Sequence, residues 1–147
     1  MINRVLIVCI GNICRSPMAE QLLREALSSS AIEIHSAGLA ALVDAPIEAT
    51  ARSVLEAHGH AAPEHRARQF TRQAASDCEL ILVMEQHQVE RILKLAPEAR
   101  GKVFLLGKWQ GNREISDPYC KGESAFKQAY ALIEEGVQAW IKRLAYP

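Results

Sequence analysis

The sequence predicts an α/β fold: a single domain with a central parallel four-stranded sheet that is flanked by helices on both faces. Three short runs are continuously apolar and rich in branched residues, as in parallel strands that are covered on both sides. Segments with the apolar spacing of helices lie between and after these runs. Strands that alternate with helices favour right-handed crossovers, which produce an open parallel sheet. No repeat or linker-like segment divides the 147 residues.

The strands are predicted from the apolar runs in chain order. Residues 5–8, 80–84 and 103–106 form the continuous runs and are expected to be central strands. Residues 32–35 alternate apolar and polar side chains, which is typical of a half-exposed edge strand. Ligands of open parallel sheets bind beyond the carboxyl ends of the strands, so the segments that follow the strands are the place to look for a site.

Four helices are predicted around these strands. The first opens at Ser16 and Pro17, the second covers residues 46–57, and the third covers residues 86–95 and stops before Pro97. The last helix continues almost to the C-terminus. Apolar stripes define the first helix through Ala19, Leu22, Leu23, Ala26 and Leu27, and the last through Phe126, Tyr130, Ile133, Val137, Trp140 and Leu144.

Composition excludes several classes of function. Lysine plus arginine equals aspartate plus glutamate at 17 each, so we expect no nucleic acid and no anionic membrane as partner. The first apolar run is too short for a signal peptide or a membrane span, which predicts a cytoplasmic protein without membrane insertion. The four cysteines are expected to be reduced thiols, and their local sequence decides whether they are reactive.

One cysteine begins an unusual segment between the first strand and the first helix. The segment reads Cys9-Ile10-Gly11-Asn12-Ile13-Cys14-Arg15-Ser16-Pro17. Backbone amides converge in such a turn, and the helix start adds unpaired donors and partial positive charge, so the loop after strand 1 is predicted to be a phosphate-binding loop. Gly11 and Asn12 both tolerate the left-handed backbone that such a loop requires. Arg15 can hold two phosphate oxygens through its planar guanidinium.

The same positive environment stabilises a thiolate, so Cys9 is predicted to be ionised at neutral pH and to act as a nucleophile. The hydroxyl of Ser16 is expected to donate to the sulfur when it departs. A lone cysteine at the end of a strand is more often a small buried hydrophobe, but the joint pattern with Gly-Asn, Arg and Ser is far more specific. No Gly-Lys-Ser/Thr signature follows a glycine-started turn, which disfavours ATP or GTP hydrolysis.

Residues 9–17, together with Ser36-Ala37-Gly38 and Asp117-Pro118-Tyr119, resemble the low-molecular-weight protein tyrosine phosphatases over nearly the whole chain. Gly107-Lys108-Trp109 and Glu114-Ile115-Ser116-Asp117-Pro118-Tyr119 resemble bacterial members that act beside tyrosine autokinases of capsule and exopolysaccharide synthesis. The resemblance implies phosphotyrosine hydrolysis through a cysteinyl-phosphate intermediate, no metal or other cofactor, and a phosphotyrosine protein, here a tyrosine autokinase, as partner. We expect a monomer or a weak dimer.

The resemblance assigns the acid to Asp117, which would protonate the leaving oxygen and then activate water. Without the family, Asp117 and Pro118 would be interpreted as a simple turn in the long connection 107–123. Tyr119 is expected to form one wall of a slot for an aromatic ring, or else to pack the loop. The resemblance places the other wall in residues 39–43, where Leu42 is expected. The predicted substrate-binding residues are Ile10, Gly11, Asn12, Ile13, Cys14, Ser16, Leu42 and Tyr119.

Other residues are given supporting or incidental roles. The resemblance implies a reversible disulfide between Cys14 and Cys9 that protects Cys9 from irreversible oxidation, although Cys14 could be an inert loop cysteine. Ser36, His65 and Asn12 are expected to support the loop. His58, His60 and His65 match no standard zinc spacing. The helix that carries Glu85, Glu90 and Arg91 is interpreted as a solvated charged face. Cys78 and Cys120 are interpreted as incidental.

Two other functions remain as alternatives. An arsenate reductase would share this fold and loop but needs a relay of further thiols. The position where that relay would begin holds Met84 and Glu85 without a following cysteine pair, and Cys78 precedes the strand. A non-catalytic phosphate-binding module is the other alternative, although every expected catalytic position is filled.

Overall fold

The computed structural model describes residues 1–62 and 64–145, and its centre is a parallel sheet. The four strands lie in the order β2-β1-β3-β4. They are β1 (Arg4–Cys9), β2 (Glu33–Gly38), β3 (Leu80–Val83) and β4 (Val103–Leu105). The predicted sheet is confirmed, and the segment predicted as an edge strand is β2, which lies at one edge and continues to Gly38. The prediction that residues 103–106 form a central strand was wrong, because β4 pairs with β3 alone and lies at the other edge.

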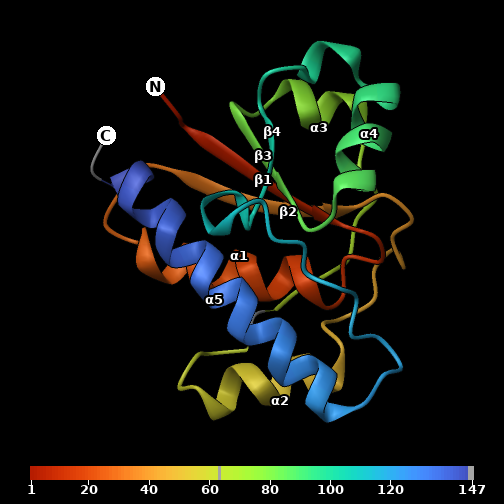
Figure 1. Cartoon of the computed structure of the whole chain (residues 1–147), viewed down its shortest axis with the longest axis vertical. Coiled ribbons are helices and arrows are strands. Elements are labelled where there is room, and N and C mark those ends of the chain that lie inside the picture. The colour runs from red at the N-terminus through yellow and green to blue at the C-terminus, as the bar shows by residue number, and fades with distance from the viewer. Residues whose placement is uncertain (63, 146–147) are drawn as a thin grey trace.

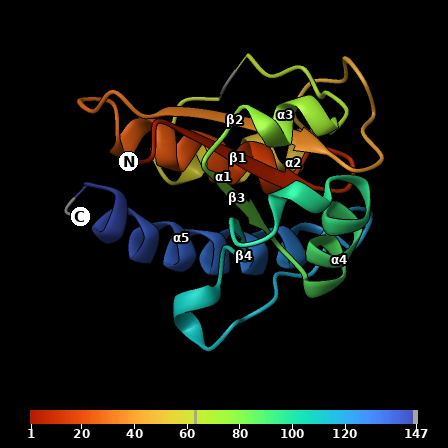
Figure 2. The same cartoon turned by 90° about the horizontal axis from the view of Figure 1, so that it is seen from above.

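Helices cover both faces of the sheet, as the sequence predicts. They are α1 (Arg15–Ala26), α2 (Ala49–Ala57), α3 (Arg72–Ser76), α4 (Gln86–Leu95) and α5 (Glu123–Ala145). Helices α1, α2 and α5 lie together on one side, and α3 and α4 lie on the other (Figure 1). Helix α5 runs nearly the full width of the molecule (Figure 2). Within the described residues, no helix is long and apolar enough to cross a membrane.

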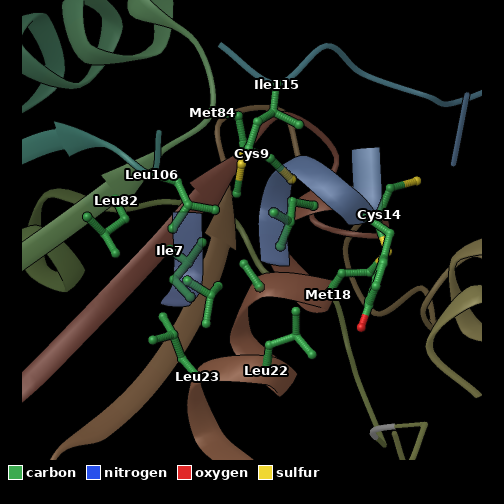
Figure 3. Packing of buried hydrophobic residues seen from close by; sticks show 14 of the residues in the cluster. Ile7, Cys9, Cys14, Met18, Leu22, Leu23, Leu82, Met84, Leu106 and Ile115 are labelled. Carbon is green, nitrogen blue, oxygen red and sulfur yellow. The ribbon is translucent and has the colours of Figure 1, made fainter. Parts of the chain in front are cut away.

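The continuous apolar character of the strands follows from burial on both faces. On β1, Val5 and Ile7 join the core under α1 and α5, whereas Leu6 and Val8 join the core under α4. Each fully buried branched side chain contributes about 1.5 to 3 kcal/mol to stability, so neither face tolerates polar residues. Figure 3 shows that the first of these cores reaches Cys9 at the end of β1.

Among the helices, two local predictions were wrong and one helix was not predicted. Helix α2 starts at Ala49 and not at residue 46, because Glu48 caps it and the Glu48 amide donates to the Ile13 carbonyl at 2.8 Å. Helix α3 was not predicted, since it has five residues and buries only Ala75. Ala26 is exposed and does not belong to the apolar stripe of α1, although Leu27 after it is buried as expected.

Candidate active site

The loop between β1 and α1 turns its carbonyl oxygens away from its own centre. The amides of Leu39, Ala40 and Leu42 donate to the carbonyls of Cys9, Ile10 and Gly11, respectively, at 2.9 to 3.1 Å. Within residues 1–62 and 64–145, no acceptor is found for the backbone amides of residues 11–14. A turn whose carbonyls are engaged outside and whose amides stay unpaired is a concave anion site. The backbone therefore has the form that the sequence predicts.

The shape of this loop depends on two residues, one of which differs from the prediction. Asn12 adopts the left-handed conformation, with φ of 59°. Gly11 does not, so its predicted left-handed backbone was wrong. The demanding glycine is Gly38 on β2, where an added Cβ would lie 2.3 Å from the Ile10 carbonyl oxygen. Only glycine permits this close approach of β2 to the loop. The Ser-Ala-Gly triplet was the sequence signal for it.

A buried hydrogen-bond chain leads to the Cys9 sulfur. Asn12 Nδ2 donates to Ser16 Oγ at 2.8 Å and to Ser36 Oγ at 3.0 Å. The Ser16 oxygen thus accepts from Asn12, which leaves its hydrogen for Cys9 Sγ at 2.9 Å. The Ser36 hydroxyl donates to Glu20 Oε1 at 2.5 Å. The structure therefore places Ser16 where it can donate to a thiolate.

The remaining supports hold the Asn12 residue itself. His65 Nε2 donates to the Asn12 carbonyl oxygen at 2.5 Å, and the Arg68 amide donates to Asn12 Oδ1 at 2.9 Å. At the other end of the hydrogen-bond chain that leads to Cys9, the Glu20 carboxylate also accepts from Arg24 at 2.5 Å. The structure thus brings the predicted supports Ser36 and His65 together at the loop. Glu20 was not predicted as a support, since it carries no local sequence signal.

Arg15 is almost completely buried, with 1% of its surface exposed, and its guanidinium is fixed from behind. Nη1 donates to Glu85 Oε1 at 2.5 Å and to the Ile115 carbonyl at 2.7 Å. A buried guanidinium requires such partners, because an unpaired buried charge is strongly unfavourable. The interpretation of Glu85 as part of a solvated face was therefore wrong. No pattern near Glu85 distinguishes it from a surface glutamate.

Asp117 lies across from the loop on an exposed turn. Its Oδ2 is 3.7 Å from Nη2 of Arg15, and its side chain is 44% exposed. Its Oδ1 accepts from the Tyr119 amide at 3.1 Å, which fixes the carboxylate over the turn. The structure thus brings Asp117 to Arg15, 102 residues away in sequence.

A cavity of about 190 Å³ joins these residues. Cys9 and Arg15 lie on the loop side, Asp117 lies across from them, and Leu42 and Tyr119 form walls that are each 48% exposed. The two predicted walls are therefore placed at the same cavity, and both are apolar or aromatic. Its remaining lining residues are Ile10, Gly11, Ile13, Cys14 and Ala40.

The other cysteines differ from Cys9 in their surroundings. Burial raises the pKa of the Cys14 thiol, and the nearby carboxylate of Asp117 and the sulfur of Cys9 raise it further. Cys14 is therefore a neutral thiol at physiological pH. Burial also raises the pKa of Cys78, whose thiol lies against the Ala75 carbonyl at 3.4 Å. Cys120 is exposed.

The three histidines singled out in the sequence do not meet. His65 lies at the phosphate-binding loop, as described above. His58 stacks on the Tyr130 ring with 4.1 Å between centroids, and His60 bonds to Tyr130 at 2.9 Å and to Glu25 at 2.5 Å. Both therefore tie residues 58–60 to α5 and α1.

Comparison with known proteins places this site in a family. The family model described as low molecular weight phosphotyrosine protein phosphatase matches residues 4–146. The chain belongs to this family. It is a low-molecular-weight protein-tyrosine-phosphatase, a phosphoric monoester hydrolase, as the resemblance implied.

Relatives and solved structures match over nearly the full length. The chain is 43% identical to the phosphatase Etp of Escherichia coli, over 97% of this chain and 95% of the relative. The crystal structure of the tyrosine phosphatase Wzb from Escherichia coli in complex with sulphate has a TM-score of 0.94 at 42% identity, covering 98% and 99% of the two chains. The arginine phosphatase YwlE from Geobacillus stearothermophilus has a TM-score of 0.90 at 30% identity, covering 97% and 93%.

Proposed function

We propose that this phosphatase hydrolyses phosphotyrosine in proteins through a phosphocysteine on Cys9, with Arg15 as phosphate clamp and Asp117 as acid and base. The observation that carries the proposal is the single cavity in which the Cys9 end of an anion-binding loop faces Asp117 between Leu42 and Tyr119. A flat aromatic ring fits between such walls better than a short aliphatic phosphoester does.

In the first step, the Cys9 thiolate attacks phosphorus and forms the S–P bond while the bond to the phenolic oxygen breaks. Asp117 gives its proton to that oxygen, so tyrosine leaves as a neutral phenol. The amides of residues 11–14 and the guanidinium of Arg15 stabilise the charge on the transferring phosphoryl group. Glu85 and the Ile115 carbonyl hold that guanidinium in place.

In the second step, water attacks phosphorus, Asp117 takes the proton of the water, and the S–P bond breaks. The bond from Ser16 to the sulfur at 2.9 Å supports its departure as a thiolate. Inorganic phosphate then leaves, and the enzyme returns to its initial state. Each step uses only residues of this chain and water.

An arsenate reductase mechanism finds less support. It needs further thiols near Cys9, yet Glu85, which follows β3, is bonded to Arg15 at 2.5 Å. Cys78 precedes β3 and is bonded to Ala75, at the opposite end of that strand. Cys14 is the thiol that shares the cavity, and its disulfide with Cys9 stays a prediction.

The physiological substrate that we propose is a bacterial tyrosine autokinase that controls exopolysaccharide or capsule synthesis. The resemblance of residues 107–109 and 114–119 to bacterial members of that type supports it. The test is dephosphorylation of an autophosphorylated tyrosine kinase encoded beside this gene. Rapid loss of its phosphotyrosine is expected. The absence of any neighbouring kinase or polysaccharide-export gene, or a kinase that resists the enzyme, would contradict this substrate. A cytoplasmic location and a monomer or weak dimer stay predictions.

The proposed chemistry is tested with three matched peptides that carry phosphotyrosine, phosphoserine or phosphoarginine. We expect the phosphotyrosine peptide to be hydrolysed fastest. Cys9→Ser should lower that rate by at least about four orders of magnitude, since it removes the nucleophile. Cys120→Ser is the control, because Cys120 is exposed and outside the cavity, and it should change the rate less than twofold. Activity retained by Cys9→Ser, or faster hydrolysis of phosphoarginine, would overturn the proposal.

A further inference from the structure

A second cavity of about 290 Å³ adjoins the catalytic cavity across Asp117, which lines both. Its walls come from the connection before α5 and from the first turns of α5 itself. Two of its lining residues, Arg113 and Lys121, are cationic, and Ser116 and Gln128 add polar groups. Any chain that extends from a residue held in the catalytic cavity therefore has this second cavity beside it.

The cations of the second cavity form no ion pair with its carboxylates. In the part of the chain that the structure describes, neither Arg113 nor Lys121 takes part in an ion pair. The two carboxylates of the cavity are directed elsewhere. Glu114 Oε2 accepts from the Gln86 amide at 2.7 Å, and Asp117 lies 3.7 Å from Arg15. The cavity therefore presents two cationic side chains that no carboxylate of the described residues holds.

Both cations extend from a fixed backbone. The Arg113 amide donates to the Gly107 carbonyl at 3.0 Å, and an added Cβ on Gly107 would lie 2.2 Å from the Arg113 oxygen. The Lys121 amide donates to the Pro118 carbonyl at 3.0 Å, in a turn where Cys120 has φ of 62°. A fixed backbone lowers the entropy cost of binding, because only the two side chains have to be ordered by a ligand.

The rim of the catalytic cavity is different, because Leu42, Ala40 and Tyr119 carry no charge. Among the residues that line the two cavities, the cations other than Arg15 therefore lie on the Asp117 side. An extended peptide advances about 3.3 to 3.6 Å per residue, so side chains one to three positions from the phosphotyrosine can reach the second cavity.

We propose that the second cavity is a substrate subsite, which binds an anionic side chain close to the phosphotyrosine. A carboxylate and a second phosphate share the required chemistry, and the planar guanidinium of Arg113 suits both. This proposal rests on the proposed function, since it presupposes a phosphotyrosine peptide in the first cavity. The enzyme then prefers phosphotyrosines that lie in acidic or multiply phosphorylated segments.

The test compares kcat/KM for three sets of peptides around one phosphotyrosine. In the first set, only alanines flank the phosphotyrosine. In the second set, a glutamate replaces one of these alanines at each position from −3 to +3 in turn. In the third set, a second phosphotyrosine replaces one alanine at the same positions. The best glutamate peptide should exceed the alanine peptide about three- to fivefold, the upper end of the range for an exposed charge pair. The second phosphate should give a larger ratio. Acceleration by phosphate alone assigns the subsite to phosphate, and acceleration by both assigns it to anions in general.

The variant Arg113→Gln with Lys121→Gln should bring these ratios to about one. The ratio is the measured quantity, so a general loss of active enzyme cancels. Arg100→Gln is the matched control, because Arg100 is exposed just before β4, at the edge of the sheet opposite the site, and the ratios should persist. Equal turnover of all peptides by the unaltered enzyme, or ratios retained in the double variant, would overturn the subsite alone. Failure to hydrolyse even the alanine peptide would overturn the proposed function and the subsite together.

Discussion

The two sides of the catalytic cavity are built differently. The loop side is part of the core: Cys9 and Arg15 are 3% and 1% exposed, and buried bonds run from the sulfur through Ser16 and Asn12. The acid side is a surface turn, where Asp117 is 44% exposed and its carboxylate accepts one bond, from Tyr119. Phosphate capture is thus organised by the fold itself, whereas the proton donor is carried by an exposed loop.

This difference predicts which substitutions affect activity alone and which also affect folding. Removing a partner in the buried network leaves polar groups without water or protein partners, at about 1 to 3 kcal/mol for each group. An exposed carboxylate has water as a substitute partner, so its loss changes stability little. Substitutions on the acid side should therefore lower activity without changing the free energy of unfolding. Substitutions on the loop side should lower both.

Asp117→Ala is expected to show the largest difference between its effect on activity and its effect on stability. Hydrolysis of aryl phosphates should slow by about two to four orders of magnitude, the usual size of a general acid contribution. The free energy of unfolding should change by less than about 0.5 kcal/mol. Steady-state kinetics and urea unfolding measure the two quantities, and Asp77→Ala is the control on another exposed aspartate. A loss of activity below tenfold would reassign the acid.

Arg15→Lys should affect both quantities. A lysine keeps the charge but cannot donate in parallel to a phosphate while it also bonds Glu85 and Ile115, so kcat/KM should fall by about two to three orders of magnitude. The free energy of unfolding should fall by about 1 to 3 kcal/mol. Arg72→Lys makes the same change at an exposed pair with Glu98 and should alter neither quantity measurably. An Arg15→Lys enzyme with ordinary activity would show that the guanidinium fork is not the clamp.

The same contrast explains what could be predicted from the sequence. Cys9 to Ser16 is one contiguous segment, so strand, turn, helix start and nucleophile are visible together. Asp117 needed the family resemblance, because Asp-Pro by itself indicates only a turn. Glu85 could not be predicted, since its bond to Arg15 joins residues 70 apart and depends on how β1 and β3 pair. Helix α3 was missed because five residues carry too little periodicity.

Two asparagines with the same backbone conformation provide a matched pair that tests what the buried hydrogen-bond network contributes to stability. Asn12 and Asn112 have φ of 59° and 58°, but Asn12 is buried and Asn112 is exposed. Asn112→Ala should destabilise by about 1 kcal/mol through the left-handed backbone alone. Asn12→Ala adds unpaired groups on Ser16, Ser36 and the Arg68 amide and should destabilise by about 2 to 4 kcal/mol. Equal destabilisation in urea unfolding would show that the network adds nothing.

Two glycines beside the loop provide the last comparison, and it includes a substitution with a small expected effect. A Cβ on Gly38 would lie 2.3 Å from the Ile10 oxygen, so Gly38→Ala must displace the loop and should destabilise by about 1 to 3 kcal/mol. A Cβ on Gly11 would meet Ile13 at an ordinary 3.7 Å, so Gly11→Ala should change stability by less than about 1 kcal/mol. Thermal unfolding of the two variants compares them directly. A more stable Gly38→Ala protein would refute the close approach.

The central claim is that the buried side of the cavity captures phosphate covalently on Cys9. Rapid acid quenching of turnover with an aryl phosphate, followed by mass spectrometry of the intact protein and its peptides, tests this most directly. We expect a mass increase of one phosphoryl group, on the peptide that holds Cys9, in the unaltered enzyme and none in Cys9→Ser. Full turnover without any phosphorylated Cys9 peptide, or a phosphoryl group on another residue, would contradict the account.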